Sequence, residues 1–236
     1  MRINYMESLQ KLISAPNITT VILLGSVLQF LSVLILPIFL LSGYFVNVLR
    51  KAALEDSDEL PDWMEFGSHL KKGLVVSFGL LPLLIPPMAL LIYGCGSLFL
   101  TLFTLLSNDG LSNGIQLEDL ATVSNPMVLL VTVSMALILL LVVSLFLPAL
   151  MARFAVTGNV VSLFRFDQAF SDMMKAPGQY FIISSIPSVG GILLSIFSLF
   201  TAGLGVVVCV PLTFLLGVLT AQLQGEYYKR YVLKTF

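Results

Sequence analysis

Residues Gly43 to Gly73 read GYFVNVLRKAALEDSDELPDWMEFGSHLKKG; a long apolar segment ends in this stretch and another begins directly after it. The stretch holds the single His of the chain, His69, the single Trp, Trp63, and the densest run of charged side chains. A charged interval between two long apolar segments is typical of a connector on one membrane surface. We therefore predict a polar, partly helical connector between two membrane spans.

The composition indicates that the chain is embedded in lipid. Of the 236 residues, 58% are hydrophobic and 11% are charged, whereas soluble domains average about 25% charged residues. The charged residues are confined to the intervals between apolar segments, because an ion at the middle of a membrane helix costs roughly 2.5–3.5 kcal/mol. We predict an all-α polytopic membrane protein. The net charge of −1 argues against nucleic acid as a partner.

The apolar segments define the expected organisation. We predict an N-terminal interfacial segment (1–17), one transmembrane domain (18–225) and a basic C-terminal tail (226–236). About five spans, with a range of four to six, are expected at about 18–49, 74–106, 127–152, 180–200 and 204–223, joined by connectors 50–73 and 153–178.

Each connector is predicted to contain an amphipathic surface helix. In the first, Leu60-Pro61-Asp62 is typical of a helix start, and His69 falls on the solvated face. The large apolar side chains of both helices are candidates for contact with lipid or a partner: Trp63, Phe66, Leu70, Phe166 and Phe170.

Two patterns inside the apolar segments suggest special structure. Prolines interrupt two spans and predict broken or kinked helices that could hold a lipid or an apolar small molecule, ordinary kinking being the alternative: Pro82, Pro86, Pro87 and Pro187. Small residues at alternating steps of four and three predict close packing on another helix, a polar pore being the alternative: Ser184, Ser188, Gly191, Ser195 and Ser198.

The distribution of basic residues predicts the orientation. The first connector carries four Lys or Arg, and the second connector and the tail carry three each, whereas residues 107–125 carry none. Both connectors and the C-terminus are therefore expected in the cytoplasm. Five spans would place the N-terminus outside, in tension with Arg2 and Lys11. A re-entrant segment, at Pro82–Pro87 or at the start of the first span, would relieve that tension.

No catalytic or metal-binding motif is recognisable in the sequence. We therefore expect no enzyme activity, no catalytic residue, no cofactor and no metal. The favoured interpretation is a non-catalytic scaffold, accessory subunit or assembly factor, with membrane lipids and other membrane-protein subunits as partners. The alternative is a carrier or binder of a lipid or apolar small molecule at the proline-broken helices.

The connector motifs resemble those of the bacterial and archaeal membrane proteins grouped as domain of unknown function 4013. The resemblance is carried by Gly43-Tyr44, Arg50, Leu60-Pro61-Asp62-Trp63, Gly67, Lys72-Gly73, Ala169-Phe170, Gly225 and Tyr228. Two positions depart from the family pattern: Lys72 stands where an acid often precedes the Gly, and Gln222 stands where His is frequent. The resemblance implies a multi-pass integral membrane protein, in the inner membrane of a prokaryote, and implies no activity.

Overall fold

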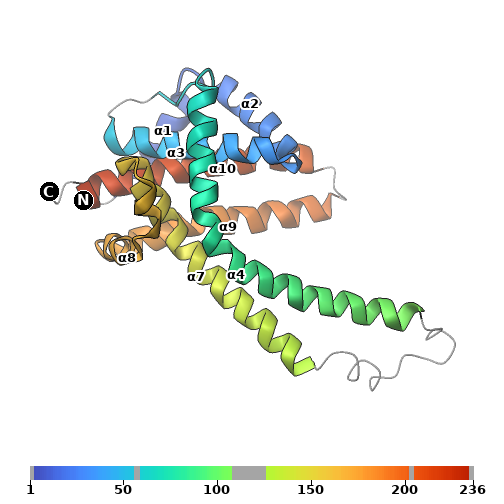
Figure 1. Ribbon diagram of the computed structural model, residues 1–236. Coiled ribbons are helices and arrows are strands. Elements are labelled where there is room, and N and C mark those ends of the chain that lie inside the picture. The colour runs from blue at the N-terminus through green and yellow to red at the C-terminus, as the bar shows by residue number, and fades with distance from the viewer. Residues whose placement is uncertain (1–2, 56–58, 108–125, 202–204, 234–236) are drawn as a thin grey trace. The chain divides into compact units, whose positions relative to one another are not determined.

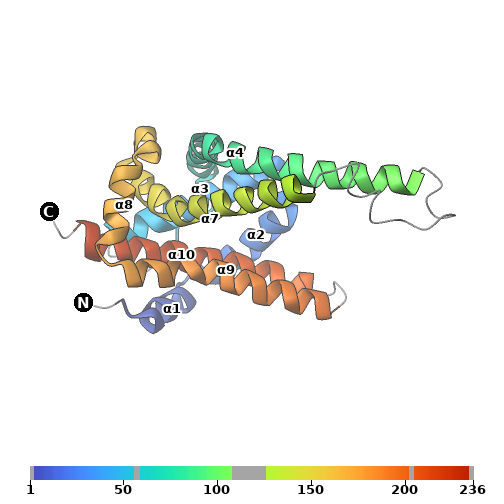
Figure 2. The same ribbon diagram turned by 90° about the horizontal axis from the view of Figure 1, so that it is seen from below.

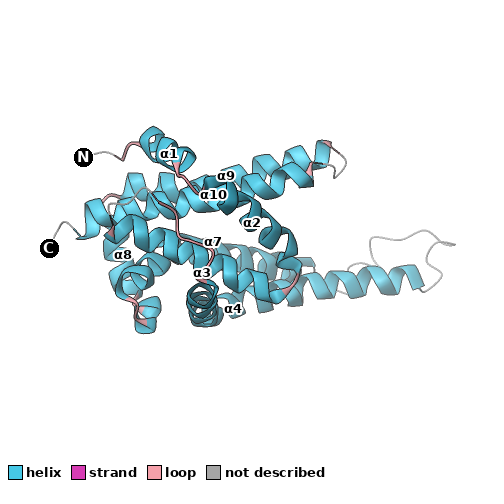
Figure 3. Cartoon of the chain, turned by 90° about the horizontal axis from the view of Figure 1, so that it is seen from above, coloured by secondary structure: helices cyan, strands magenta, loops and turns pink. Residues whose placement is uncertain are grey.

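The computed structural model describes residues 3–55, 59–107, 126–201 and 205–233. These residues are 89% helical and include no strand, as Figure 3 shows. Five of the helices are long and apolar enough to cross a membrane. An all-α chain with several candidate spans is therefore confirmed. The predicted loop of residues 107–125 lies almost wholly outside the described residues.

The helices follow one another along the chain as Figure 1 labels them. They are α1 (Tyr5–Ser14), α2 (Ile18–Phe30), α3 (Ile35–Leu54), α4 (Phe66–Ser107), α7 (Pro126–Thr157), α8 (Phe166–Met174), α9 (Pro177–Phe200) and α10 (Val206–Tyr227), with short turns η1 (Leu31–Val33), η2 (Val160–Phe164) and η3 (Tyr228–Val232). The chain divides into two compact units: unit 1 is Met1–Gly79 with Phe146–Phe236, and unit 2 is Leu80–Leu145.

The first apolar segment is not the single helix predicted over 18–49. Helix α2 ends at Phe30, a 3-10 turn follows, and Leu34 is extended (φ −84°, ψ 138°) before α3 begins. Pro37 explains the break, because a proline inside a helix clashes with the carbonyl four residues earlier but is tolerated in the first turn. The helix therefore restarts next to Pro37 instead of bending at it.

Helix α2 folds back along α3 at one side of unit 1. The Asn17 side chain at the start of α2 donates from Nδ2 to the Leu60 carbonyl at 3.1 Å, and Leu60 follows the end of α3. Gly25 lies against the Phe214 ring of α10, with no room for a side chain between them. Helices α2 and α3 are therefore an antiparallel pair.

The first connector contains no separate surface helix. The expected helix start at Leu60 is wrong: residues 59–65 are largely irregular, and α4 begins at Phe66 and is assigned as one helix through Pro82, Pro86 and Pro87. In the C-terminal segment predicted as a basic tail, α10 continues to Tyr227 and a π-helical turn extends through Val232.

Close helix crossings build unit 1. Helix α10 packs against α2, α3 and α9, and Figure 2 shows α9 and α10 side by side. Gly225 of α10 lies so close to α3 that a Cβ atom there would be 2.6 Å from the Leu49 carbonyl oxygen. Unit 2 pairs α4 with α7, and a Cβ atom on Gly94 would be 3.0 Å from Val133 Cγ2.

Candidate functional site

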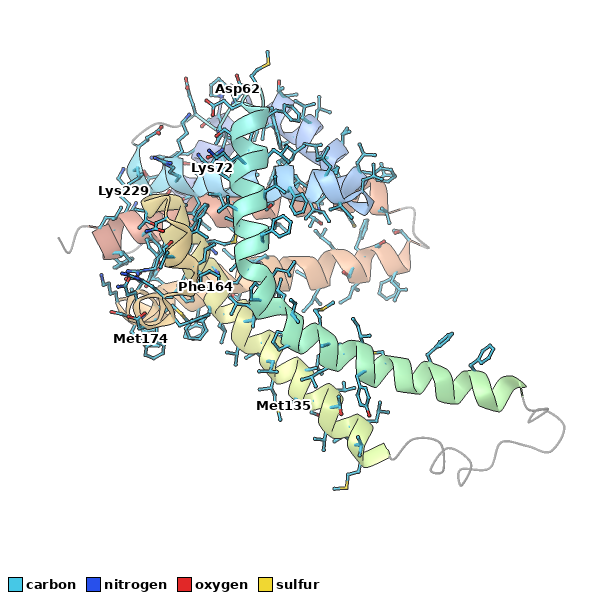
Figure 4. All side chains as sticks on the ribbon, in the orientation of Figure 1. Asp62, Lys72, Met135, Phe164, Met174 and Lys229 are labelled. Carbon is cyan, nitrogen blue, oxygen red and sulfur yellow. The ribbon has the colours of Figure 1, made fainter. Side chains whose placement is uncertain are left out.

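The polar side chains of unit 1 gather at one end, where α3 and α10 end and where α4, α8 and α9 begin. Figure 4 shows Asp62 and Lys72 at the first turns of α4. We call this region the charged end. It contains two polar clusters, one around the buried His69 and one around the buried Asp172, and two hollows.

The first cluster, which we call the Asn47 cluster, comprises Asn47, Asp62, His69 and Lys72. Its His69 ring is completely buried, so the predicted solvated His is wrong. His69 Nδ1 lies 2.6 Å from Asn47 Nδ2, and His69 Nε2 lies 2.9 Å from the Asp62 carbonyl oxygen. Lys72 Nζ donates to Asn47 Oδ1.

These contacts assign the proton on the imidazole. An ammonium can only donate, so Lys72 fixes the amide of Asn47 with its oxygen toward Lys72 and its nitrogen toward His69. The amide nitrogen also only donates, which makes Nδ1 of His69 the acceptor. The ring proton is therefore on Nε2 and is donated to the Asp62 carbonyl. The network joins α3, the connector and α4 through a neutral His.

Two glycines allow the Asn47 cluster to form. A Cβ atom on Gly43 would overlap the His69 carbonyl oxygen, and one on Gly73 would overlap the Phe39 carbonyl oxygen. The backbones of α3 and α4 therefore touch at Gly43 and Gly73, which are the two ends of the charged stretch between the first two apolar segments. Small residues permit such close approach of helices in lipid.

Trp63 is part of the interior of unit 1. Its side chain is 3% exposed, and its ring stacks on Tyr44 with centroids 4.1 Å apart and planes 7° apart. The prediction that Trp63 is a surface contact is therefore wrong. The irregular backbone of residues 59–65 turns Trp63 inward, whereas Phe66 remains 48% exposed and Leu70 is half-buried.

The second cluster, which we call the Asp172 cluster, joins the end of α7 to α8 and α10. The Asp172 carboxylate accepts from Arg153 Nε at 2.6 Å and from the Tyr228 hydroxyl at 2.9 Å, and Lys175 Nζ lies 3.7 Å away. The Tyr227 hydroxyl donates to the Asp172 carbonyl oxygen at 2.7 Å. Asp172 is 3% exposed, so this carboxylate lies in the interior of unit 1 although α8 is amphipathic.

Helix α8 presents its apolar side chains in two directions. Ala169 and Met173 are buried in the interior of unit 1, while the side chains of Phe166 and Phe170 are 38% and 50% exposed. Figure 4 places Met174 on the same short helix. Both predicted contact residues of the second connector therefore remain accessible.

Helix α1 is fastened to the charged end. The Tyr5 hydroxyl donates to Gln179 Oε1 at 2.7 Å, and the Ser8 hydroxyl donates to Glu226 Oε1 at 2.8 Å. Burial, with a smaller contribution from Tyr231, raises the pKa of Tyr5, so its phenol stays a neutral donor. The N-terminal helix and the end of α10 therefore lie at the same end of unit 1 (Figures 1 and 3).

Two hollows open at the charged end. The mixed hollow, of about 690 Å³, is lined by charges of both signs, among them Arg50, Lys51, Glu59 and Glu65. The basic hollow, of about 630 Å³, is lined by residues of α3, α4, the end of α7 and the turn that follows it. The lining residues of the basic hollow are Val46, Arg50, Gly67, Ser68, Lys71, Lys72, Val75, Phe154, Ala155, Gly158 and Val160, with no acidic residue among them.

The prolines of the apolar segments lie elsewhere. Pro87 is buried in unit 2, whereas Pro82 and Pro86 in unit 2 and Pro187 in unit 1 are exposed. None of these prolines lines either of the two hollows.

The stripe of small residues on α9 is only partly covered by this chain. Ser188 and Ser195 are exposed, Ser184 and Ser198 are half-buried, and a Cβ atom on Gly191 would meet nothing within 4 Å. Gly190, one residue away, makes the close contact instead, with Leu216 of α10. Within the described residues the stripe is therefore not closely packed along its length, and its packing on another helix stays a prediction.

Sequence reasoning missed Asn47, Arg153, Tyr227 and Tyr228 as members of the clusters. Their partners are far away in sequence, so periodicity could not find them. The only signal was in the family motifs, which include Tyr228.

The comparison with family models gives one match, over residues 30–203, to the family described as Protein of unknown function (DUF4013). No curated protein and no solved structure matches the chain.

Proposed function

Because the chain belongs to the family described as Protein of unknown function (DUF4013), a family without an assigned activity, we propose a function from its own geometry: a non-catalytic membrane scaffold, an accessory subunit or assembly factor for another membrane protein. The buried polar groups of unit 1 carry this proposal. Most of them bind one another across helix ends, His69 with Asn47 and Asp172 with Arg153 and Tyr228.

The Asn47 cluster supports a structural role for the only His. Both ring nitrogens of His69 are occupied by Asn47 and by the Asp62 carbonyl, and the ring is buried. A general base needs hydrogen-bond reach to the proton that it takes, and a His enclosed in this way has none.

The Asp172 cluster supports the same role at the other helix ends. The Asp172 carboxylate contacts Arg153, Lys175 and Tyr228, and these contacts hold α7, α8 and α10 together. A rigid charged end of this kind suits a protein whose task is to present fixed surfaces.

We place the charged end in the cytoplasm and the described chain in the inner membrane. Arg50, Lys72, Arg153 and Lys229 all lie at this end, and basic residues favour the cytoplasmic side. The fold of α1 and α2 supports an N-terminus on the same side, which removes the tension that Arg2 and Lys11 would otherwise create.

The test is photo-crosslinking in native membranes followed by extraction in mild detergent. A photoreactive residue replaces Ser188 or Ser195 on α9, and Leu193, which is 63% exposed on another side of the helix, is the matched control position. We expect a discrete adduct with another membrane protein from Ser188 or Ser195 and none from Leu193. A single monodisperse species without adducts at any position would contradict the scaffold proposal.

A further inference from the structure

We propose that the basic hollow binds the phosphate-bearing head group of an anionic membrane lipid. The inference goes beyond the scaffold proposal, because it holds whether or not a partner protein is captured. It rests on the charges, the walls and the position of a hollow that lies wholly within unit 1.

The charges of the basic hollow favour an anion. No hydrogen bond or ion pair joins Arg50 or Lys71 to any residue that the structure describes, and Lys72 binds only the neutral Asn47 amide. Arg50 and Lys72 lie close enough for their charges to repel each other, although Glu65 offsets part of that repulsion. An oxyanion between them would convert repulsion into attraction and would supply acceptors for Arg and Lys donors.

The backbone around the hollow also leaves room for a ligand. Gly67 and Ser68, in the first turn of α4, line it, and a helix N-terminus favours anions through its free N–H groups. Cβ atoms on Gly67 and Gly158 would meet nothing within 4 Å, so a ligand can approach either backbone closely. Gly158 needs to be glycine, because its φ of 68° is left-handed.

The C-terminal end of α7, which also lines the hollow, repels an anion only weakly. Its C-terminal turn, at Phe154 and Ala155, carries a partial negative charge of about half a unit, which the N-terminus of α4 balances. The side chains of Arg50, Lys71 and Lys72 then give the lining of this hollow a net positive charge, although Arg50 and Lys72 also face the acids of the mixed hollow.

The walls of the hollow favour a lipid over a free phosphate. Val46, Val75, Phe154 and Val160 line the hollow beside the cations. Arg50 lies at the end of one candidate span, and Lys71 and Lys72 lie at the start of another. Cations at a span end with apolar walls next to them match an amphiphile that has its phosphate at the membrane surface and its chains in the membrane.

The experiment measures binding to the full chain, purified in a neutral detergent, by native mass spectrometry and by ligand-induced thermal shift. The probes are a short-chain phosphatidylglycerol, a phosphatidylcholine with the same chains, and glycerol 3-phosphate. We expect phosphatidylglycerol to bind at least tenfold more tightly than either of the other two, because only it combines net charge with chains.

The variant R50Q/K71Q tests the site and leaves the Asn47 cluster intact. Each basic residue near a lipid surface contributes about a factor of five, so the affinity for phosphatidylglycerol should fall about 25-fold. The matched control K51Q/R165Q removes the same charge from residues outside the basic hollow and should change the affinity by less than about threefold. If R50Q/K71Q melts below the wild type without lipid, the single variant K71Q, at an exposed position, replaces it.

Three results would overturn the proposal. Equal affinity for phosphatidylcholine would show that the hollow does not recognise the charge of the head group. An equal loss of phosphatidylglycerol affinity in K51Q/R165Q would show only diffuse electrostatic attraction. Glycerol 3-phosphate binding as tightly as the lipid would show a site for a soluble phosphate instead of a lipid.

Discussion

At the scale of single residues, buried hydrogen bonds decide what holds the charged end together. His69 makes two of them, with the Asn47 amide nitrogen and with the Asp62 carbonyl oxygen, which also accepts from the Glu65 backbone N–H at 3.4 Å. Removing the ring leaves the buried Asn47 amide nitrogen without this partner, which costs more than the net value of the bond itself.

We predict that His69→Ala lowers the stability of the chain by about 2–4 kcal/mol, since the buried Asn47 amide loses its partner and a cavity remains. The expected fall in melting temperature in detergent is about 5–10 °C. Ser68→Ala, at the adjacent half-buried residue, is the control and should shift the melting temperature by less than about 2 °C. An unchanged melting temperature for His69→Ala would show that the ring does not hold α3, the connector and α4 together.

Asp172 gives a second prediction at this scale. Asp172→Asn removes the charge that faces Arg153 and Lys175, and breaking one partner of a buried pair costs about 3–5 kcal/mol. Because Arg153 is partly exposed, we expect the lower part of that range, measured as loss of thermal stability. Asp167→Asn, exposed in the first turn of the same helix α8, is the matched control and should cost less than about 1 kcal/mol. Equal effects of the two changes would contradict the assigned role of Asp172.

The sequence could not predict these residue-scale contacts. The helical spacing of Trp63, Phe66 and Leu70 suggested one continuous amphipathic helix, which put His69 on the solvated side. In the structure the backbone before Phe66 is irregular, so the Asp62 carbonyl meets the His69 ring and Trp63 turns inward. Asn47, the other partner of His69, lies 22 residues away, and no local pattern indicates such a pair.

At the scale of helices, close backbone crossings explain why certain glycines stand where they do. The crossing of α3 and α4 uses Gly43 and Gly73, and the crossing of α3 and α10 uses Gly225. Each crossing replaces side-chain contact by backbone contact, which is a common way for helices to associate in lipid.

We predict that Gly43→Ala and Gly73→Ala each disrupt the crossing of α3 and α4, because each added methyl group would overlap a carbonyl oxygen of the other helix. The expected loss is about 2–4 kcal/mol, or failure to accumulate in the membrane. Gly67→Ala is the matched control: it adds the same methyl group to α4 where nothing lies within 4 Å, and it should leave stability unchanged or slightly raised. Gly43→Ala with wild-type thermal stability would contradict the crossing.

The helices themselves were largely predictable, because long apolar segments without charge specify them. Four of the five predicted spans correspond to α4, α7, α9 and α10. The first, predicted as one span over 18–49, is instead the two helices α2 and α3. Hydropathy cannot distinguish a long tilted helix from two short ones folded back, because both have the same composition. The tertiary contacts of Asn17 and Gly25 decide between them.

At the scale of the whole molecule, the question is how the ends of unit 1 relate to the two membrane surfaces. Helix α2 has 13 residues and is about 20 Å long, too short for a hydrocarbon layer of about 30 Å. Its start lies at the charged end, beside Leu60, and its far end joins α3 at Leu34, which is 59% exposed and apolar. An exposed apolar turn of this kind suits the interior of the membrane, so α2 and α3 would enter from the cytoplasm and return to it.

This topology predicts which engineered cysteines react with a membrane-impermeant maleimide in cells. In a background with Cys95 and Cys209 replaced by Ala, Asn4→Cys and Lys175→Cys should react only after the cells are permeabilised, because both positions lie at the charged end. Thr201→Cys, at the opposite end of α9, should react in intact cells. Leu34→Cys should react in neither condition, because a thiol inside the hydrocarbon layer does not form the reactive thiolate. Labelling of Asn4→Cys in intact cells would place the N-terminus outside. Labelling of Leu34→Cys in intact cells would mean that α2 crosses the membrane, and either result would refute the folded-back arrangement in the membrane.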